Sequence, residues 1–185
     1  EFRPLQKIKT KLSTRENPQI TCLRADTHRQ AQINADLLKE VCRIYADTFK
    51  QNQEAQGYLI KRGITNKELW NRYNLGYSDG KTLKNLIPDE AEQSFKDAGI
   101  LNGKGNESFY RCITFPIYDE NDATVGMYGR RVENSETLNR KPETPCAGHL
   151  YLKGPHRAVW NWRAAKVYDE VILTESIIDA LTLIQ

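Results

Sequence analysis

The sequence lacks the features that would place it at once in a special class of protein. No stretch approaches the roughly 18 consecutive apolar residues of a membrane-spanning helix, and no apolar signal core stands near the N-terminus. Internal repeats and low-complexity tracts are absent as well. These absences predict a cytoplasmic protein that does not enter a membrane.

Cysteine and histidine are scarce and widely spaced. The cysteines contain no CxxC pair, the short spacing that is typical of zinc sites, and the histidines supply no compact alternative. Reduced thiols in the core or at the surface are expected, and a metal clip is the alternative. The residues concerned are Cys22, Cys42, Cys112, Cys146, His28, His149 and His156.

The composition is that of an ordinary globular protein, with 39% hydrophobic and 28% charged residues in a chain of 185. The net charge is only +3, but it is unevenly distributed. Residues 1–15 form a basic arm, residues 126–165 are mostly basic, and four carboxylates crowd residues 169–179. Basic clusters beside carboxylates suit a polyanion track that leads to a metal site. From composition alone, solvated surface charge is the simpler interpretation.

The first two thirds of the chain read mainly as helices. Residues 1–28 show no clear period and predict an extended basic entry segment. Apolar residues then recur at three- and four-residue spacings, which predicts a long amphipathic helix over residues 29–54. A short helix follows over 56–62 and is stopped by Gly63.

Further helix signals precede residue 108. Thr65 and Glu68 have the spacing of a capping box, which predicts a third helix ending before Gly76. Pro88 marks a helix start, and residues 89–98 run to Gly99 as the helix end. Gly103 and Gly105 mark a turn.

From residue 108 the sequence changes to strand character. The segments FYRCITFPIYD and TVGMYGRRV, joined by ENDA, predict a hairpin because aromatic and β-branched residues dominate them. Residues 133–149 read as a polar loop, and residues 157–165 predict a helix that carries Trp160 and Trp162. The apolar EVILT segment, 170–174, predicts a buried strand of a parallel sheet, and a helix follows it.

Two carboxylates stand where that last strand gives way to the helix. Glu175 ends the predicted strand, in the position where open α/β sheets place ligands, and Asp179 lies one helical turn later. Such a pair could hold Mg²⁺ or assist proton transfer. The alternative is that Glu175 only stabilises the helix start with its charge.

The segment VILTESIIDALTLIQ resembles the first motif of the TOPRIM domain, in which a strand ends in Glu and an Asp follows four residues later. Ser176 stands where that family usually has Gly. Upstream, AQGYLIKRGITNKELWNRYNLGYSDG, ITFPIYDENDATVGMYGRRV and HLYLKGPHRAVWNWRAA are similar to successive phrases of bacterial DnaG-type primases. Together these phrases cover about residues 29–185 and favour a primase over other TOPRIM enzymes.

The resemblance implies roles for individual residues. Arg130 matches a hairpin arginine of the basic ridge that holds template and nucleotide, Lys153 matches the lysine of the Lys-Gly phrase, and Glu175 matches the catalytic, metal-proximal glutamate. Asp179 is the second implied metal ligand. Further candidates for nucleic acid and nucleotide are Arg131, Arg157, Arg111 and Lys141.

The sequence also departs from the family. Cys112 stands where the family has an arginine, and the neighbouring Arg111 would face the other way in a strand. The family's Pro-Lys-Tyr-Leu-Asn lysine has no clear match, although Arg140 or Lys141 could replace it. These departures indicate a divergent primase such as phages, plasmids or other mobile elements carry. The Asp-x-Asp motif that completes the metal site is not present, so a fragment that is inactive by itself is expected.

The resulting prediction is an α+β fold. It comprises an extended basic entry segment over 1–28, a DnaG-like basic subdomain over 29–165, and the first β-α unit of a TOPRIM domain over 166–185. The whole protein is expected to make short RNA primers from ribonucleotides on single-stranded DNA with Mg²⁺ or Mn²⁺, with a replicative helicase as a conceivable partner. The alternatives are a non-catalytic module that binds single-stranded DNA in a mobile-element protein, and a TOPRIM nuclease.

Overall fold

The computed structural model describes residues 18–132 and 148–185, with side chains from residue 33 onward. The chain divides into two compact units, residues 1–33 and 34–185. Within the first, the described residues are helical and belong to α1 (Pro18–Gln51). The extended conformation predicted for residues 18–28 is therefore wrong. Pro18 suits the first helical position because its ring presets φ and no partner is needed there for its missing N–H.

The remaining helices of the described residues follow α1, most of them close to their predicted positions. They are α2 (Gln53–Lys61), α3 (Lys67–Arg72), α4 (Glu92–Asp97), α5 (Ala164–Val167) and α6 (Ile177–Ile184), with the short 3-10 helices η1 (Lys84–Leu86) and η2 (Asp89–Ala91). Gly63 and Gly99 follow α2 and α4 at φ +83° and +76°, which confirms both as helix ends. The cap of α3 is Asn66, whose side chain accepts from the Glu68 N–H, and Thr65 does not have this role.

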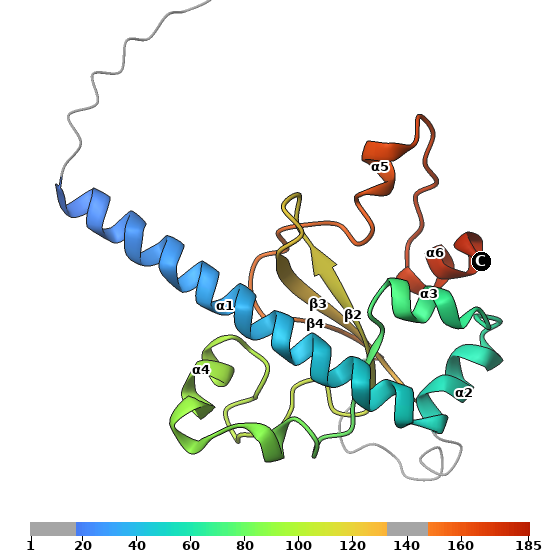
Figure 1. The fold of residues 1–185 in the computed structure, drawn as a ribbon, viewed down its shortest axis with the longest axis horizontal. Coiled ribbons are helices and arrows are strands. Elements are labelled where there is room, and N and C mark those ends of the chain that lie inside the picture. The colour runs from blue at the N-terminus through green and yellow to red at the C-terminus, as the bar shows by residue number, and fades with distance from the viewer. Residues whose placement is uncertain (1–17, 133–147) are drawn as a thin grey trace, which may run out of the picture. The chain divides into compact units, whose positions relative to one another are not determined.

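Among the described residues, four antiparallel strands form one sheet in the order β1 (Gly76–Ser78), β2 (Cys112–Tyr118), β3 (Thr124–Arg131) and β4 (His149–Tyr151). The predicted hairpin is confirmed as β2 and β3, and Figure 1 shows its two strands at the centre of the fold. In its register Ile113 lies opposite Arg130 and Phe115 opposite Tyr128. Strand β4 pairs with β3, so the described segment that begins at residue 148 joins the same sheet.

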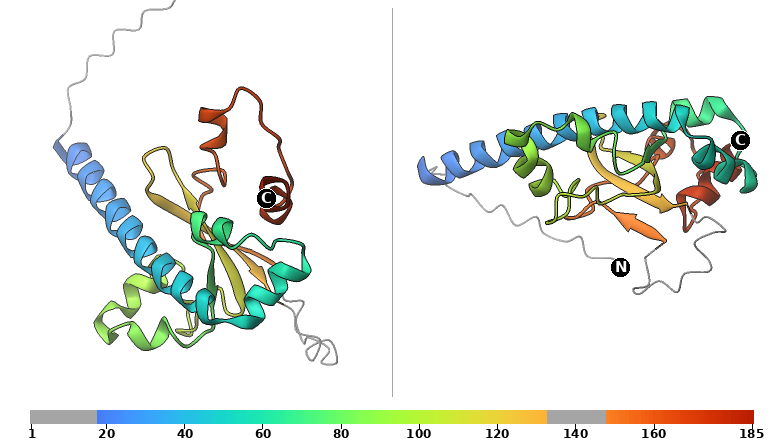
Figure 2. Two further views of the ribbon diagram at one scale, coloured as in Figure 1. Left: turned by 45° about the vertical axis from the view of Figure 1, so that its right-hand side comes forward. Right: turned by 90° about the horizontal axis from the view of Figure 1, so that it is seen from below.

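The C-terminal half of α1 covers one face of this sheet (Figure 2, right). Val41 and Tyr45 are buried there with Cys112 and Met127 of the hairpin. Gly76 lets the helix approach closely, since a Cβ built on it would lie 2.6 Å from the Cβ of Tyr45. Burying these apolar side chains stabilises the fold by roughly 1.5–3 kcal/mol for each large one.

The opposite face packs against α2, α3 and α6. Phe115 and Tyr128 of the hairpin are buried there with Leu59 of α2, Trp70 of α3 and Leu181 of α6. Helix α6 also meets the turn between α2 and α3, because the Gln185 side chain donates to the Gly63 carbonyl and accepts from the Thr65 N–H. The C-terminal helix is therefore part of this core.

Two cysteines lie inside the fold. Cys42 and Cys112 are free and buried, and burial raises the pKa of the Cys42 thiol to about 12 and that of Cys112 to about 11. Both remain neutral thiols at physiological pH, as expected for reduced core residues. The side chains of Cys22 and Cys146 lie outside the described residues.

The helix predicted over 157–165 is not formed as expected. Residues 160–163 form turns and only Ala164–Val167 is helical. Asn161 has φ +55°, a left-handed conformation that interrupts a right-handed helix. The two tryptophans serve as anchors instead: Trp160 stacks on Tyr73, with ring centroids 4.7 Å apart, and the Trp162 indole N–H donates to the Asp119 carbonyl.

The buried strand predicted over 170–174 is also wrong. The segment forms no strand, and Ile172 and Leu173 are 78% and 89% exposed. A strand needs a hydrogen-bonded neighbour, and none of the described strands pairs with it.

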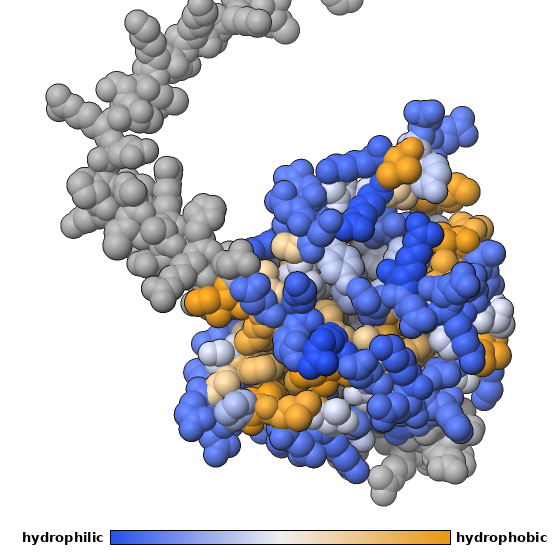
Figure 3. All heavy atoms as spheres, in the orientation of Figure 1, coloured by the Kyte–Doolittle hydropathy of each residue, from blue (hydrophilic) through white to orange (hydrophobic). Residues whose placement is uncertain are grey.

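On the face drawn in Figure 3, apolar side chains interrupt the polar surface near α6 and again near α4. Among the helices that the structure describes, none is both long and apolar enough to cross a membrane.

Candidate nucleic-acid interface

Arg130 lies near the end of β3, and residues far away in the sequence hold its side chain. Its Nε donates to the Tyr58 hydroxyl of α2 at 2.9 Å, and its Nη1 donates to Nε2 of His149 on β4. Nδ1 of the same imidazole lies 2.6 Å from the Tyr128 hydroxyl. Three elements, α2, β3 and β4, therefore fix the direction of one guanidinium.

The hydrogen bonds of His149 determine which ring nitrogen carries its proton. A guanidinium can only donate, so Nε2 must accept and Nδ1 must donate to the Tyr128 oxygen. Burial raises the pKa of the Tyr128 hydroxyl above its usual range, although the nearby charge of Arg130 opposes the shift. Tyr128 is thus a neutral hydroxyl.

A second arginine lies on the same side of the sheet but is paired differently. Arg111 precedes β2 at φ +60°, and its guanidinium lies 3.2 Å from Oε1 of Glu54, one turn before Tyr58 on α2. The backbone N–H of Arg111 donates to the Ser78 carbonyl, and the Arg111 carbonyl accepts from the Val132 N–H. These two bonds stabilise the uncommon backbone conformation. Helix α2 therefore contacts both arginines, but it compensates the charge of Arg111 with a carboxylate.

Arg131 follows Arg130 and points to the other face of the sheet, as strand alternation requires. It lies opposite Cys112 in the register. Its Nε is buried and has no hydrogen-bond partner among the described residues. The two neighbouring arginines therefore cannot act together on one side of the sheet.

Lys153 and Arg157 follow β4 and are exposed. A Cβ built on Gly99 would lie 3.2 Å from the Cβ of Lys153, so the base of the lysine side chain lies beside the residue that follows α4. Within the part of the chain that the structure describes, neither residue forms an ion pair. The remaining basic candidate, Lys141, lies outside the described residues.

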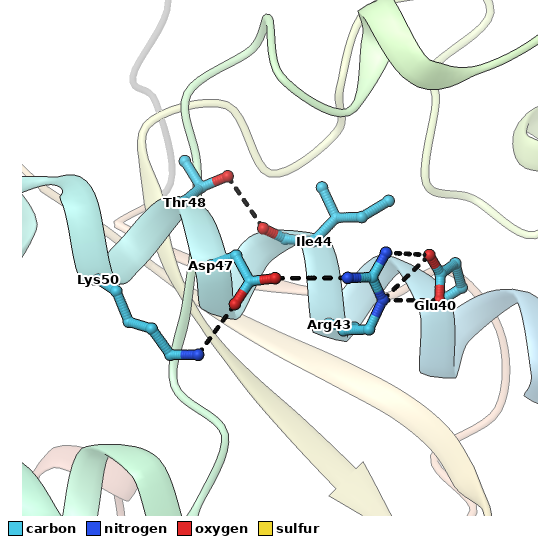
Figure 4. A network of polar contacts seen from close by, with 6 residues as sticks. All are labelled: Glu40, Arg43, Ile44, Asp47, Thr48 and Lys50. Carbon is cyan, nitrogen blue, oxygen red and sulfur yellow. Dashed lines mark hydrogen bonds and ion pairs between the residues drawn. The ribbon is translucent and has the colours of Figure 1, made fainter.

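Other cations are compensated by carboxylates. Figure 4 shows α1, where Arg43 lies between Glu40 and Asp47, and Lys50 also contacts Asp47. Arg163 is paired in the same way with Asp122 of the hairpin turn. Exposed pairs of this kind contribute little to stability, about 0–1 kcal/mol each, but they reduce the charge that these side chains present to a polyanion.

Within the described residues, the two acidic candidates do not gather with further potential metal ligands. Glu175 is exposed just before α6. Asp179 accepts a 2.8 Å hydrogen bond from the Ser176 hydroxyl, while Ser176 caps the helix by accepting from the Asp179 N–H. This capping arrangement gives Asp179 a structural role. No group of three or more potential metal-ligating side chains exists within residues 33–132 and 148–185.

Sequence reasoning found Arg130 but missed the residues that orient it. The sequence contains signals for two of these residues. Tyr128 lies two residues before Arg130 in the predicted strand and so shares its face, and His149 opens the HLYLKG phrase. The contact to Tyr58 spans 72 residues and only the fold reveals it.

Comparison with known proteins assigns the chain to a family. The family model for the N-terminal domain of the DNA primase catalytic core matches residues 44–150. The chain belongs to the bacterial DnaG-type primase family, as the sequence resemblance predicted, and it has the expected α+β fold. The match includes the hairpin and the Arg130 network.

Similar proteins include bacterial DNA primases. That of Legionella pneumophila is 27% identical over 86% of this chain and 29% of its own length. That of Neisseria meningitidis serogroup A is 31% identical over 76% of this chain and 24% of its own. The chain thus spans about a quarter of the length of these relatives.

Solved structures agree. A DnaG primase catalytic domain bound to ssDNA is 26% identical with a TM-score of 0.55, and the match covers 69% of this chain and 41% of that one. A DnaG catalytic core is 22% identical with a TM-score of 0.63, over 82% of this chain and 50% of that one, which supports the fold. The match to primases favours that family over the TOPRIM nuclease alternative.

The bond from Arg130 to Tyr58 can be tested by removing one oxygen atom. Tyr58→Phe should lower the free energy of unfolding by about 1–2 kcal/mol, because it deprives a partly buried charged donor of its acceptor. The measurement is urea denaturation monitored by circular dichroism. Tyr73→Phe is the matched control, since the Tyr73 hydroxyl has no hydrogen-bond partner among the described residues. Equal effects of the two substitutions would contradict the network.

Proposed function

We propose that this chain is the part of a DNA primase that holds single-stranded DNA, and that the whole protein makes RNA primers on it. The observation that carries the proposal is the Arg130 guanidinium, which Tyr58 and His149 orient. A side chain held in one direction loses less entropy when it meets a phosphate. Its planar fork suits the bidentate recognition of phosphate oxygens.

The proposed track runs from Arg130 to the segment that follows β4. His149 pairs with Arg130 in the register, and Lys153 and Arg157 lie a few residues further along the chain. A primase contact of this kind reads phosphates and not bases. The DnaG catalytic domain solved with ssDNA is the relative that supports single-stranded DNA as the ligand. Arg111 is less suited to this role because Glu54 compensates it.

The chemistry of the whole protein is nucleotidyl transfer assisted by Mg²⁺ or Mn²⁺. Such transfer depends on positioning phosphates and neutralising their charge. The described residues do not form a complete metal site, because Asp179 is engaged with Ser176 and Glu175 stands alone. Glu175 is therefore proposed as a single contributor, and the isolated chain is not expected to make primers. Ribonucleotides and a replicative helicase remain further proposed partners.

The non-catalytic alternative keeps one supporting observation. Because Glu175 and Asp179 do not meet further carboxylates within the described residues, a module that binds single strands without synthesis fits the same geometry. Primer synthesis by the longer protein distinguishes the two functions, since a binding module would give none.

The phosphate track predicts a salt-dependent contact at Arg130. For single strands, log Kd changes by about 0.7 per log salt for each phosphate neutralised. Arg130→Ala should weaken binding of an oligothymidylate and lower the salt slope by about that amount. Fluorescence anisotropy at several salt concentrations measures both quantities.

The control is Arg43→Ala, which removes the same charge from α1, where Glu40 and Asp47 already compensate it. It should leave affinity and slope unchanged. A wild-type affinity that does not vary with salt, or an equal loss from the two substitutions, would contradict the track.

The proposed role of Glu175 is tested in the longer protein. Glu175→Gln keeps the shape of the side chain and removes its charge, so primer yield should fall about a hundredfold or more if the carboxylate acts in catalysis. The melting temperature should hardly change, since a charge at a helix start contributes about 0.3–1 kcal/mol. Glu170→Gln, an exposed carboxylate five residues earlier, is the control. Normal primer yield from Glu175→Gln would leave only the helix-start role.

A further inference from the structure

An exposed aromatic pair stands beside the Arg130 network. Tyr151 ends β4 and is 54% exposed, yet rings hold it on two sides. Its centroid lies 4.9 Å from that of His156, at an interplanar angle of 88°, and 5.1 Å from that of Tyr128. The Tyr128 ring in turn stacks on Phe115 in the core. The exposed Tyr151 ring therefore belongs to a series of contacting rings that begins in the core with Phe115.

The pair lies on the same face of the sheet as Arg130. Tyr128 is paired with Tyr151, and Arg130 with His149. Because side chains two residues apart on a strand share a face, these four side chains lie next to one another on one face of the sheet. Arg157 directly follows His156 in the chain and is exposed. Arg130 thus shares one face of the sheet with the exposed ring, and Arg157 is the sequence neighbour of its partner His156.

The chemistry of this patch suits one kind of occupant. Exposed aromatic faces between cations are what proteins use to stack the bases of single strands while basic side chains follow the phosphates. A purely structural ring at the sheet edge would need no flanking charge.

We propose that Tyr151 and His156 form a stacking platform for one base of single-stranded DNA, with Arg130 and Arg157 beside it to contact the neighbouring phosphates. The proposal rests on the proposed DNA-binding function and adds a contact to a base, which the phosphate track does not require. Stacking should tolerate any base because every base has a π-face.

The test separates bases from phosphates. The 185-residue chain is titrated with an oligothymidylate of about twelve nucleotides and with an abasic strand that carries the same number of phosphates. Wild type should bind the thymidylate about 5- to 150-fold more tightly than the abasic strand, the range corresponding to loss of one stacked base. Tyr151→Leu should lose most of this difference while its affinity for the abasic strand stays unchanged.

Matched variants keep the test specific. Tyr151→Phe keeps the ring and should retain the preference, while His156→Ala should reduce it. Tyr168→Leu makes the same change at another exposed tyrosine, 64% exposed, and should behave as wild type. Melting curves of each variant show whether it is folded, and the wild-type comparison of the two strands needs no variant at all.

The outcomes distinguish this proposal from the proposed function. Salt-dependent binding of both strands with equal affinity would keep the phosphate track and overturn the platform. A Tyr151→Leu protein that keeps the full preference, or loses affinity for both strands equally, would overturn the platform as well. Absence of binding to either strand would overturn both proposals.

Discussion

The alternation of side chains along β3 is the constraint on which the rest of the structure depends. Met127 is buried with side chains of α1, and strand alternation puts Arg131 on the same face of the sheet. Tyr128 is buried with side chains of α2 and α6 on the opposite face, where Arg130 bonds to Tyr58 of α2. One short strand therefore supplies both cores and then, at its end, places one arginine on each side. Because β4 pairs with the same strand, the residues that orient Arg130 are positioned by the same alternation. A one-residue slip in this hairpin would exchange the two faces.

This arrangement explains why net charge says little about the surface of the molecule. A chain with 27 basic and 24 acidic residues carries only +3, and the fold decides which cations are compensated locally. Arg43, Arg111 and Arg163 lie against carboxylates. Lys153 and Arg157 have no such partner among the described residues, and a hydroxyl and an imidazole hold Arg130 in place. The proposed polyanion track consists of these last three cations.

The sequence predicted the parts of the fold that local physics decides. The β2–β3 hairpin followed from aromatic and β-branched runs around ENDA, and the ends of α2 and α4 followed from Gly63 and Gly99. The strand predicted over 170–174 was wrong because apolar content indicates burial only. A β-strand also requires a neighbouring strand with which it can form hydrogen bonds. The helix around Trp160 misled because tertiary contacts of the two tryptophans override local preference, with Asn161 left-handed between them.

The candidate site was predictable only in part, for the same reason. Family resemblance identified Arg130, Lys153 and Glu175 as separate positions. It could not identify Tyr58 or the proton position on His149, since both depend on contacts between distant segments. Asp179 shows the converse, because its spacing from Glu175 suggests a ligand pair while the structure gives it a capping bond with Ser176.

We propose that single-stranded DNA lies on the β3–β4 face that carries Arg130. The most direct measurement is a titration of the isotope-labelled chain with a short oligothymidylate, followed by backbone amide shifts in NMR spectra. We expect the shifts to concentrate in residues 128–130 and 149–157, with little change along residues 40–50 of α1. Shifts concentrated along α1, with residues 128–130 and 149–157 unmoved by saturating DNA, would contradict it.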